Sequence, residues 1–238
     1  MKTVVVDGQT YRLDDQDPRV LVGTGGEADV YWFEPNQEFI RRHGDNRYVV
    51  KIAHPAETKA QKRTARERQD RLSSVPWGQL PDNVIAPVAL AYDASQQEAI
   101  GYVMVYVPDA VPLSDFKTAE FRETNSITIE HLMRIMANLH ATVNAIHASG
   151  FVIGDFNDKN VLVTPDLEVW MIDADSLQYE GWESPAFTET FVDPKIIAPH
   201  PDRPSALIKT GAFSQATDWY AFAVMLFQLV VGIHPYMD

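Results

Sequence analysis

The stretch from Asp155 to Asp173, DFNDKNVLVTPDLEVWMID, decides the fold because it combines three oxygen ligands with two short apolar strands. Asp155 is followed five residues later by Asn160, and Asp173 comes directly after the second strand. Carboxylate and carboxamide oxygens suit Mg²⁺, which proteins usually hold through one or two carboxylates together with the phosphates of a nucleotide. Asp and Asn are also common turn formers, which leaves a purely structural hairpin open. The spacing favours a phosphotransfer site on a β-hairpin.

Composition narrows the class of protein. The 238 residues are 45% hydrophobic and 22% charged, as in a globular protein large enough for two lobes. Twenty basic and 33 acidic residues give a net charge of −13, which disfavours nucleic acid and anionic membranes as partners. The absence of cysteine excludes disulfides, thiolate zinc sites and thiol nucleophiles, and it fits a reducing compartment. The first residues, MKTVVVDGQTY, do not form a signal peptide, so we expect a cytoplasmic protein.

One segment is apolar almost throughout. Trp219 to Val231 (WYAFAVMLFQLVV) has thirteen residues, which is too short to span a bilayer. A helix that is apolar on all sides is typical of the centre of a helical lobe. We therefore expect a buried core helix and no membrane span.

The hydrophobic pattern changes near Val107. Residues 1–107 read as strands, starting with a hairpin turn at Asp7-Gly8, and are interrupted by one charged helix from about Glu57 to Leu72. Residues 108–238 read as helices, with a loop-rich stretch from about Ser176 to Gln215. The clearest helix ends at Gly150 and carries an apolar stripe of Ile129, Leu132, Met136, Leu139, Val143 and Ile146. The sequence thus predicts an α+β fold with two lobes, residues 1–107 and 108–238, and a cleft between them.

A glycine cluster and a lysine in the first lobe suggest a phosphate-binding site. GTGGEADVY places Gly23, Gly25 and Gly26 between two strands, where backbone N–H groups can approach phosphate. The next strand, YVVK, ends in Lys51, and Glu67 lies sixteen residues further on a helix, where it can pair with Lys51. Each residue also has a purely structural interpretation, in which the glycines serve a hairpin, the lysine lies on the surface and the glutamate is an exposed helix residue.

Together these motifs resemble the eukaryotic-like protein kinase superfamily. Gly23, Gly25, Ala28 and Val30 match G-x-G-x-x-G-x-V with its third glycine replaced, and Lys51 matches the VAIK lysine. IGDFNDKN resembles the H-R-D catalytic loop, Asp173-Ala174-Asp175 resembles the D-F-G triplet, and Asp218 resembles the aspartate that opens the central helix of the large lobe. The resemblance covers about residues 18–238 and implies a bilobal kinase-like fold with one main helix in the β-rich lobe.

The resemblance implies ATP and Mg²⁺ as cofactors and gives each motif residue a role. Asp155 would accept or orient the proton of the acceptor hydroxyl, Asn160 and Asp173 would hold Mg²⁺, and Lys159 would bring a cation to the γ-phosphate. The implied nucleotide-binding residues are Gly23, Gly25, Gly26, Val30, Lys51, Glu67, the gatekeeper Met104, Val105 and Val107. Asp218 is expected to accept hydrogen bonds from the backbone of the catalytic loop, and His147 is expected to be a buried strut.

Several residues depart from the kinase pattern. Gly154 replaces the H-R-D arginine, so activation by loop phosphorylation at Thr188 or Thr190 is not expected. Ala174 and Asp175 replace the phenylalanine and glycine of D-F-G, and Asp175 offers either an extra ligand or a stiffer segment. Asn157 stands where a lysine is usual, and Lys195 stands where the A-P-E glutamate is expected. The sequence stops two residues after HPY, which predicts a shortened or truncated C-terminal lobe.

A narrower resemblance, in GDFNDKN, IDADSLQ and FQLVVGIHPY, is to a bacterial kinase-like group associated with helix-hairpin-helix extensions and metal-dependent protein phosphatases. It implies bacterial signalling, with phosphate transfer to a protein Ser, Thr or Tyr hydroxyl and a phosphatase as partner. Two alternatives remain, a pseudokinase that binds nucleotide as a scaffold and a small-molecule kinase of the aminoglycoside or choline type. The basic helix from Lys59 to Arg71 is either a solvated face that supports Glu67 or a docking surface for an acidic partner.

Overall fold

The computed structural model describes residues 1–14, 17–55, 59–184 and 186–236. The chain divides into two compact units. The N-terminal unit comprises Met1–Gly78 and Ile85–Val107, and the C-terminal unit comprises Gln79–Val84 and Pro108–Asp238. The short segment Gln79–Val84 therefore lies in the second unit, although we predicted it in the N-terminal lobe. Its contacts explain this placement, because they are made with residues of the C-terminal unit. Asn83 Nδ2 donates to Thr142 Oγ1 and to the Val169 carbonyl, and Val84 forms a β-bridge with Met171.

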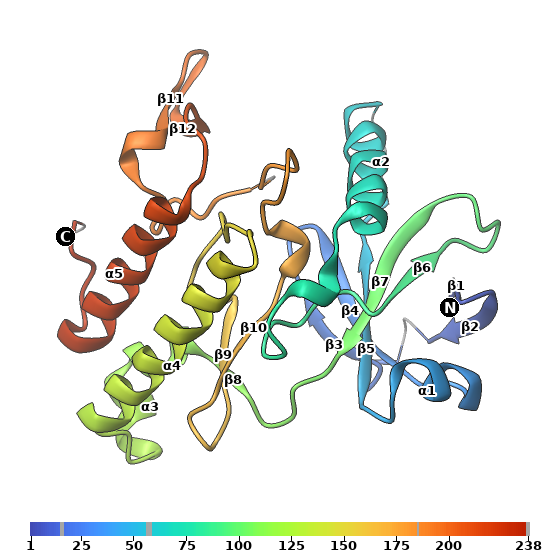
Figure 1. Ribbon diagram of the computed structural model, residues 1–238, viewed down its shortest axis with the longest axis horizontal. Helices are drawn as coiled ribbons and strands as arrows, with labels where there is room; N and C mark the ends of the chain where they lie inside the picture. Colours follow the sequence, from blue (N-terminus) through green and yellow to red (C-terminus); the bar gives the residue numbers. More distant parts are fainter. Residues whose placement is uncertain (15–16, 56–58, 185, 237–238) are drawn as a thin grey trace. The chain divides into compact units, whose positions relative to one another are not determined.

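The N-terminal unit is built on a seven-stranded antiparallel sheet with the order β2-β1-β6-β7-β5-β4-β3 (Figure 1). Its strands are β1 (Lys2–Val6), β2 (Gln9–Leu13), β3 (Leu21–Thr24), β4 (Ala28–Phe33), β5 (Tyr48–Ala53), β6 (Ala89–Tyr92) and β7 (Ala99–Val105). The predicted hairpin turn between β1 and β2 is confirmed, since Asp7 and Gly8 both have positive φ, 49° and 75°. Two positive φ values are what a tight two-residue hairpin loop requires.

The two faces of this sheet have different roles. Along β5, Tyr48, Val50 and Ile52 point into an apolar core, in which they join residues such as Phe33 and Val103. Side chains alternate between the faces of a strand, so Lys51 lies on the opposite face. The alternation therefore separates one face that packs into this apolar core from the other face, which carries Lys51.

Two helices accompany this sheet. Helix α2 (Lys59–Ser74) packs against β7, where Gln69 Oε1 accepts a hydrogen bond from the Ala99 backbone at 3.1 Å. Its predicted start at Glu57 lies outside the described residues. Helix α1 (Gln37–His43) was not predicted, so the expectation of a single helix in this unit was wrong. With seven residues and one buried side chain, Phe39, it is too short to show a helical period.

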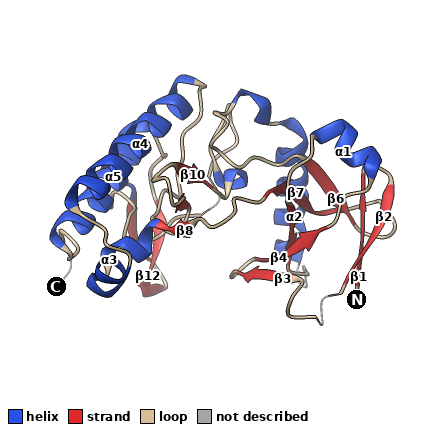
Figure 2. Cartoon of the chain, turned by 90° about the horizontal axis from the view of Figure 1, so that it is seen from below, coloured by secondary structure: helices blue, strands red, loops and turns tan. Residues whose placement is uncertain are grey.

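The C-terminal unit contains α3 (Ala119–Thr124), α4 (Ile129–Ala148) and α5 (Gln215–Val231). Helices α4 and α5 lie side by side (Figure 2). The predicted stripe is buried on α4 from Leu132 to Ile146. Ile129 is the exception at 50% exposed, because it is the first residue of the helix, directly after its cap Thr128. The helix ends before Gly150, whose φ of +84° suits glycine.

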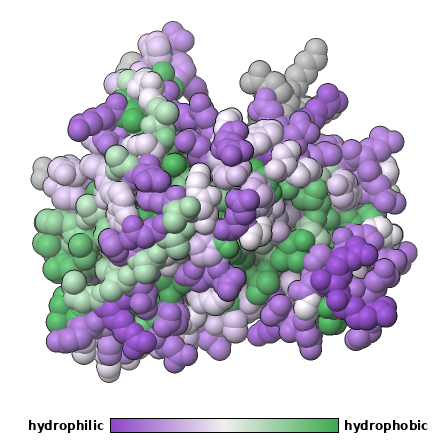
Figure 3. All heavy atoms as spheres, viewed as in Figure 1, coloured by the Kyte–Doolittle hydropathy of each residue, from purple (hydrophilic) through white to green (hydrophobic). Residues whose placement is uncertain are grey.

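Helix α5 is buried only on one side. Ala221, Val224, Met225 and Leu229 are buried, while Phe227, Val230 and Val231 are 39–51% exposed. The prediction of a core helix was therefore correct for the face that packs against α4 and wrong for the opposite face, which contributes apolar surface at the left of Figure 3. No helix in the described part of the chain combines the length and hydropathy needed to span a membrane.

Two small sheets complete the unit. The first has the order β10-β9-β8 and consists of β8 (Val111–Pro112), β9 (Val161–Val163) and β10 (Val169–Met171). The second is an antiparallel ribbon of β11 (Ile197–His200) and β12 (Arg203–Lys209), within a stretch that we predicted to be loop-rich. Prolines at 199 and 204 weaken the strand signal there. The 3₁₀ turns are η1 (Trp77–Gln79), η2 (Leu113–Lys117), η3 (Ala174–Ser176) and η4 (Pro194–Ile196).

Candidate active site

The three ligands of the opening motif line one cavity in the C-terminal unit. This cavity has a volume of about 340 Å³, and Asp155, Asn160 and Asp173 all contribute to its wall. The sequence-predicted Lys159 also lines it. The other lining residues are Lys117, Asn157, Asp158, Thr188, Thr190 and Phe191. The cavity thus brings together four residues that the sequence singled out, with six that it did not assign to the site.

The hairpin of β9 and β10 places Asn160 and Asp173 near each other. Val161 pairs with Met171, and the Ile172 backbone N–H donates to the Asn160 carbonyl at 3.0 Å. Asp173 follows directly and adopts a left-handed conformation with φ of 66°. Its carbonyl accepts hydrogen bonds from the backbone and hydroxyl of Ser176, at 2.9 and 2.8 Å. These bonds offset the cost of a left-handed backbone at a residue other than glycine.

The Asp155 carboxylate accepts a hydrogen bond from a side-chain alcohol. Thr188 Oγ1 donates to Asp155 Oδ1 at 2.7 Å, and Asn157 Nδ2 donates to the same oxygen at 3.3 Å and to Thr188 Oγ1 at 3.1 Å. The sequence treated Thr188 only as a candidate phosphorylation site. The structure makes it a direct partner of the predicted catalytic carboxylate.

Asn157 organises the rest of the catalytic loop. Its side chain is buried, and its Oδ1 accepts from the backbone N–H groups of Lys159 and Asn160 at 3.0 and 3.3 Å. The sequence alone marks Asn157 only as a position where a lysine is missing. The tendency of Asn to hydrogen-bond backbone N–H groups two or three residues ahead is the signal that indicates this role.

The orientation of Asn160 is also determined. Its Nδ2 donates to the Asp155 carbonyl at 3.2 Å. The carbonyl oxygen of the carboxamide is therefore the atom left to accept from, or to ligate, another group. This arrangement suits a cation ligand.

Two lysines line the cavity, but they differ in their contacts. Lys117 forms an ion pair with Asp158, whose side chain is only 5% exposed, and lies over the Phe191 ring. Lys159 is exposed, and its ammonium forms no ion pair within the described residues. The charge of Lys117 serves the buried Asp158, whereas the charge of Lys159 is available to an anionic ligand.

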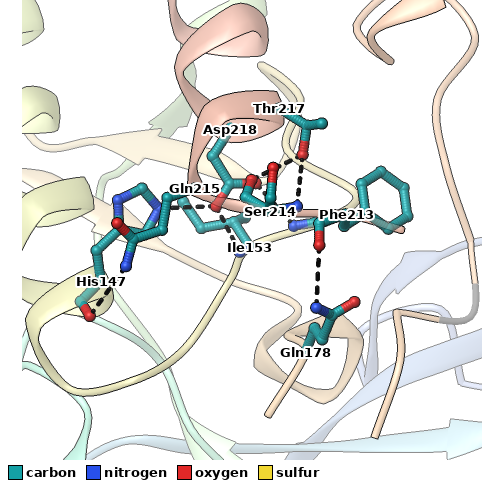
Figure 4. A network of polar contacts seen from close by, with 9 residues as sticks. His147, Ile153, Gln178, Phe213, Ser214, Gln215, Thr217 and Asp218 are labelled. Atoms are coloured by element: carbon teal, nitrogen blue, oxygen red, sulfur yellow. Dashed lines mark hydrogen bonds and ion pairs between the residues drawn. The ribbon is translucent and has the colours of Figure 1, made fainter. Parts of the chain in front are cut away.

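Asp218 fixes the backbone of the catalytic loop from the first turn of α5 (Figure 4). Its Oδ2 accepts from Ile153 N and from His147 Nε2, both at 2.8 Å, and its Oδ1 accepts from Gly154 N at 3.0 Å. Asp218 is 1% exposed and His147 is 8% exposed. The predictions that Asp218 accepts from this backbone and that His147 is buried are therefore confirmed.

In the N-terminal unit, three of the predicted nucleotide-binding side chains share one face of the sheet. Val30 lies opposite Lys51, and Lys51 lies opposite Tyr102, with the Lys51 ammonium 5.6 Å from the centre of the Tyr102 ring. Two pairs further along, Val49 lies opposite Met104, and residues directly opposite in a ladder project to the same side. The sequence missed Tyr102 and Val49, which the period-2 pattern around Lys51 places on this face.

The glycine cluster forms the turn between β3 and β4. Gly25 N donates to the Ala28 carbonyl at 2.8 Å, so Gly26 and Glu27 lie at the tip of the turn. Gly23 pairs with Val30 in the flanking ladder. Glu27 Oε2 accepts from Arg68 Nη2 at 2.9 Å, which ties the turn to α2. Glu67 is exposed on the same helix, and its ion pair with Lys51 stays a prediction.

Two further predicted nucleotide-binding residues, Val105 and Val107, lie at the end of β7 and just beyond it. Val105 pairs with Tyr48, and Tyr106 N donates to the Arg47 carbonyl at 2.9 Å. The Arg47 guanidinium lies 4.7 Å from the Trp32 ring centre and 5.1 Å from that of Tyr106. Val107, at the end of this stretch, is buried.

A second polar group lies on β4, next to the glycine turn. Asp29 accepts from Tyr31 OH at 3.1 Å and lies 3.2 Å from His54 Nε2. The hydrogen bond with His54 lowers the pKa of Asp29, and the bond from Tyr31 and the charge of Lys2 add to this effect against the opposing effect of desolvation. Asp29 therefore prefers its charged form in the folded protein.

The antiparallel sheet carries the glycine turn and the lysine, and the helical unit carries the Asp, Asn and Asp ligands, as expected of a protein-kinase-like domain. The sequence profile of the family described as protein kinase domain matches residues 19–238, and the chain belongs to this family. The predicted resemblance to the kinase superfamily and the α+β kinase fold are confirmed.

Known protein kinases are similar to this chain. Protein kinase YegI of Escherichia coli is 27% identical over 162 residues, which cover 66% of this chain and 22% of that protein. Mouse serine/threonine-protein kinase LATS1 is 23% identical, with 63% of this chain and 16% of that protein covered. Mouse citron Rho-interacting kinase is 23% identical, with 94% and 10% covered. The chain spans less than a quarter of the length of each of these relatives.

Proposed function

We propose that the chain is an active protein kinase that uses ATP and Mg²⁺ to phosphorylate Ser or Thr side chains of a protein. The observation that carries the proposal is the 2.7 Å hydrogen bond from the Thr188 hydroxyl to Asp155, in the cavity that Asn160 and Asp173 also line. It supports a carboxylate that is accessible to an aliphatic alcohol beside a set of metal-type ligands. A similar relative, LATS1, is named a serine/threonine-protein kinase.

The residues of the cavity fit Mg²⁺. The Asp173 carboxylate and the Asn160 carbonyl oxygen are hard ligands of the kind that Mg²⁺ takes when phosphates and waters complete its shell. The amide nitrogen of Asn160 is engaged by the Asp155 carbonyl, which favours metal binding through the oxygen. When bound with ATP, Mg²⁺ would neutralise charge on the β- and γ-phosphates.

The chain's own groups then have separate tasks. Asp155 would orient the acceptor hydroxyl and accept its proton while the oxygen bonds to the γ-phosphorus and the bond to the β–γ bridging oxygen breaks, releasing ADP. Lys159 would offset phosphate charge at the cavity, and Lys51, paired with Glu67, would hold the α- and β-phosphates. The remaining proposed contacts to ATP are Gly23, Gly25, Gly26, Val30, Met104, Val105 and Val107.

Transfer of labelled phosphate tests this proposal. Asp155→Asn and Asp173→Asn are expected to lower transfer from γ-labelled ATP to a protein acceptor by about 10²- to 10⁴-fold while the melting temperature stays close to that of the wild type. Asp166→Asn is the matched control, because Asp166 is an exposed carboxylate in the turn of the same hairpin. The proposal fails if the wild type transfers no label to itself or to a generic acceptor.

A pseudokinase is the second candidate, and Ala174 favours it. Ala174 is 1% exposed and stands where the D-F-G phenylalanine is expected, so the packing contribution of that ring is absent. A rise in melting temperature with ATP and Mg²⁺ in a protein that turns over no ATP would support this candidate. Turnover by the wild type that Asp155→Asn abolishes would exclude it.

The wider assignments do not depend on the geometry of the site. A protein substrate fits the kinase family, and we propose bacterial signalling because YegI is a bacterial relative. The link to the helix-hairpin-helix group, a metal-dependent phosphatase partner, the exclusion of nucleic acid and a cytoplasmic location stay predictions.

A further inference from the structure

The segment that follows β10 packs directly on the catalytic loop at Gly154. A Cβ atom at position 154 would lie 2.5 Å from Ser184 Cβ and 2.6 Å from Ser184 Oγ, closer than real Cβ contacts. Ser184 is 3% exposed, and its hydroxyl donates to the Ala186 carbonyl at 3.3 Å. We call residues 182–184 and 186–192 the docked segment. A side chain at position 154 therefore has no space, and the docked segment must be held by groups elsewhere.

The cation that holds the docked segment comes from the β11–β12 ribbon. Lys209, at the end of β12, places its Nζ 2.8 Å from Glu183 Oε2 and 3.5 Å from the Ser184 carbonyl. The same ammonium lies 5.2 Å from the ring centre of Phe213. Lys209 therefore contacts the docked segment through a charge pair and a backbone bond, beside the residue that Gly154 faces.

Other contacts hold the same segment further along the chain. Thr188 bonds to Asp155, and His234 Nε2 lies 2.8 Å from the Thr190 carbonyl. Val192 is buried in a cluster with Ile196 and Phe213. The segment is thus fixed at both ends, and Asp155 receives its alcohol partner from the middle of it.

We propose that Lys209 is a positioning residue that, by pairing with Glu183, holds the docked segment in its catalytic conformation without loop phosphorylation. Glu183 provides the negative charge on the segment, and Lys209 provides the positive charge that Gly154 lacks. The inference rests on the proposed kinase activity, since it assigns a cause to the geometry at Asp155. It also makes the ribbon part of the active unit.

The charges agree with this role. The hydrogen bond from Lys209 lowers the pKa of Glu183, so the carboxylate is charged at neutral pH. The Lys209 side chain is 24% exposed and the Glu183 side chain is 66% exposed, so water screens the pair in part. Ion pairs of this kind have modest effects, so loss of Lys209 is expected to lower kcat about fivefold rather than abolish it.

The test compares Lys209→Met, Lys209→Arg, Glu183→Gln and the swap Glu183→Lys/Lys209→Glu with the wild type. Lys209→Met and Glu183→Gln are expected to lower kcat with little change in KM for ATP and to speed hydrogen exchange in the docked segment. Lys209→Arg and the swap are expected to restore both. Lys195→Met, which removes another exposed lysine of this unit, is the matched control and is expected to change neither. The wild type is expected to keep its kcat after phosphatase treatment.

Two readouts separate this inference from the proposed function. If the wild type transfers no phosphate, the proposed function fails, and hydrogen exchange still tests whether Lys209 holds the segment. The inference is overturned if Lys209→Met leaves both exchange and kcat unchanged, or if the swap restores neither. Loss of activity on removal of phosphate from the wild type would also overturn it, because the segment would then depend on phosphorylation.

Discussion

Gly154→Ala is the most direct test of how closely the docked segment packs on the catalytic loop. Two separate costs are expected. Gly154 has a φ of +76°, and an L-residue in left-handed conformation costs about 1 to 2 kcal/mol. The added Cβ would also overlap Ser184 Cβ at 2.5 Å and Oγ at 2.6 Å.

The overlap adds to the backbone cost. Ser184 is buried, so its side chain has no free space to move into, and overpacking of this kind costs about 1 to 3 kcal/mol. Gly154→Ala is therefore expected to lower the free energy of unfolding by about 2 to 5 kcal/mol. Gly181→Ala is the matched control, because Gly181 has a φ of +92° but an added Cβ there would meet no described atom within 4 Å. It is expected to show the backbone cost alone.

Urea unfolding followed by tryptophan fluorescence measures both variants, and Ser184→Gly completes a double-mutant cycle with Gly154→Ala. In the double variant the overlapping atoms are gone, so the part of the cost above that of Gly181→Ala should be recovered. Phosphate transfer should recover with it. Equal losses in Gly154→Ala and Gly181→Ala, or no recovery in the double variant, would refute the close contact between Gly154 and Ser184.

Two further perturbations test other polar groups. Asp218→Asn places an amide N–H₂ against donors that now face a carboxylate, and a loss of about 2 to 3 kcal/mol in the free energy of unfolding is expected; an unchanged urea midpoint would contradict the network. Asp29→Asn tests a pH effect: because His54 lowers the pKa of Asp29, the stabilisation is present above the ordinary carboxyl pKa of about 3.9 and is lost as the pH falls through the lowered folded value. The difference in stability between wild type and Asp29→Asn should therefore shrink below pH about 4, and a difference that does not change with pH would exclude this cause.

The sequence predicted the elements that local periodicity encodes. The stripe on α4 and the hairpin turn at Asp7-Gly8 depend on spacing and on residues that tolerate positive φ, and both are present. The ligand hairpin was also predicted, because β9 and β10 are adjacent in the chain and pair directly. Features of this kind are set within about twenty residues of sequence, where propensity and alternation are informative.

The parts that the sequence missed depend on contacts between distant residues. Thr188 lies 33 positions from Asp155, and Lys209 lies 26 positions from Glu183, so no local pattern links them. The same holds for Gly101, where a Cβ would lie 2.0 Å from the Lys51 carbonyl in the neighbouring strand. In a single sequence, a glycine required by close approach of a neighbouring backbone cannot be distinguished from one that only weakens its strand.

The catalytic loop is held by many small contacts, and their size determines how variants should behave. One neutral hydrogen bond contributes about 0.5 to 1.5 kcal/mol, whereas a domain is stable by about 5 to 15 kcal/mol. Loss of one bond from Asn157 to the catalytic loop, or of one bond from Lys209 to the docked segment, is therefore too small to unfold the C-terminal unit. It is nevertheless large enough to shift the loop among conformations by up to about tenfold. For such variants kcat should fall well before the melting temperature does, because the geometry around Asp155 depends on these bonds more than the fold does.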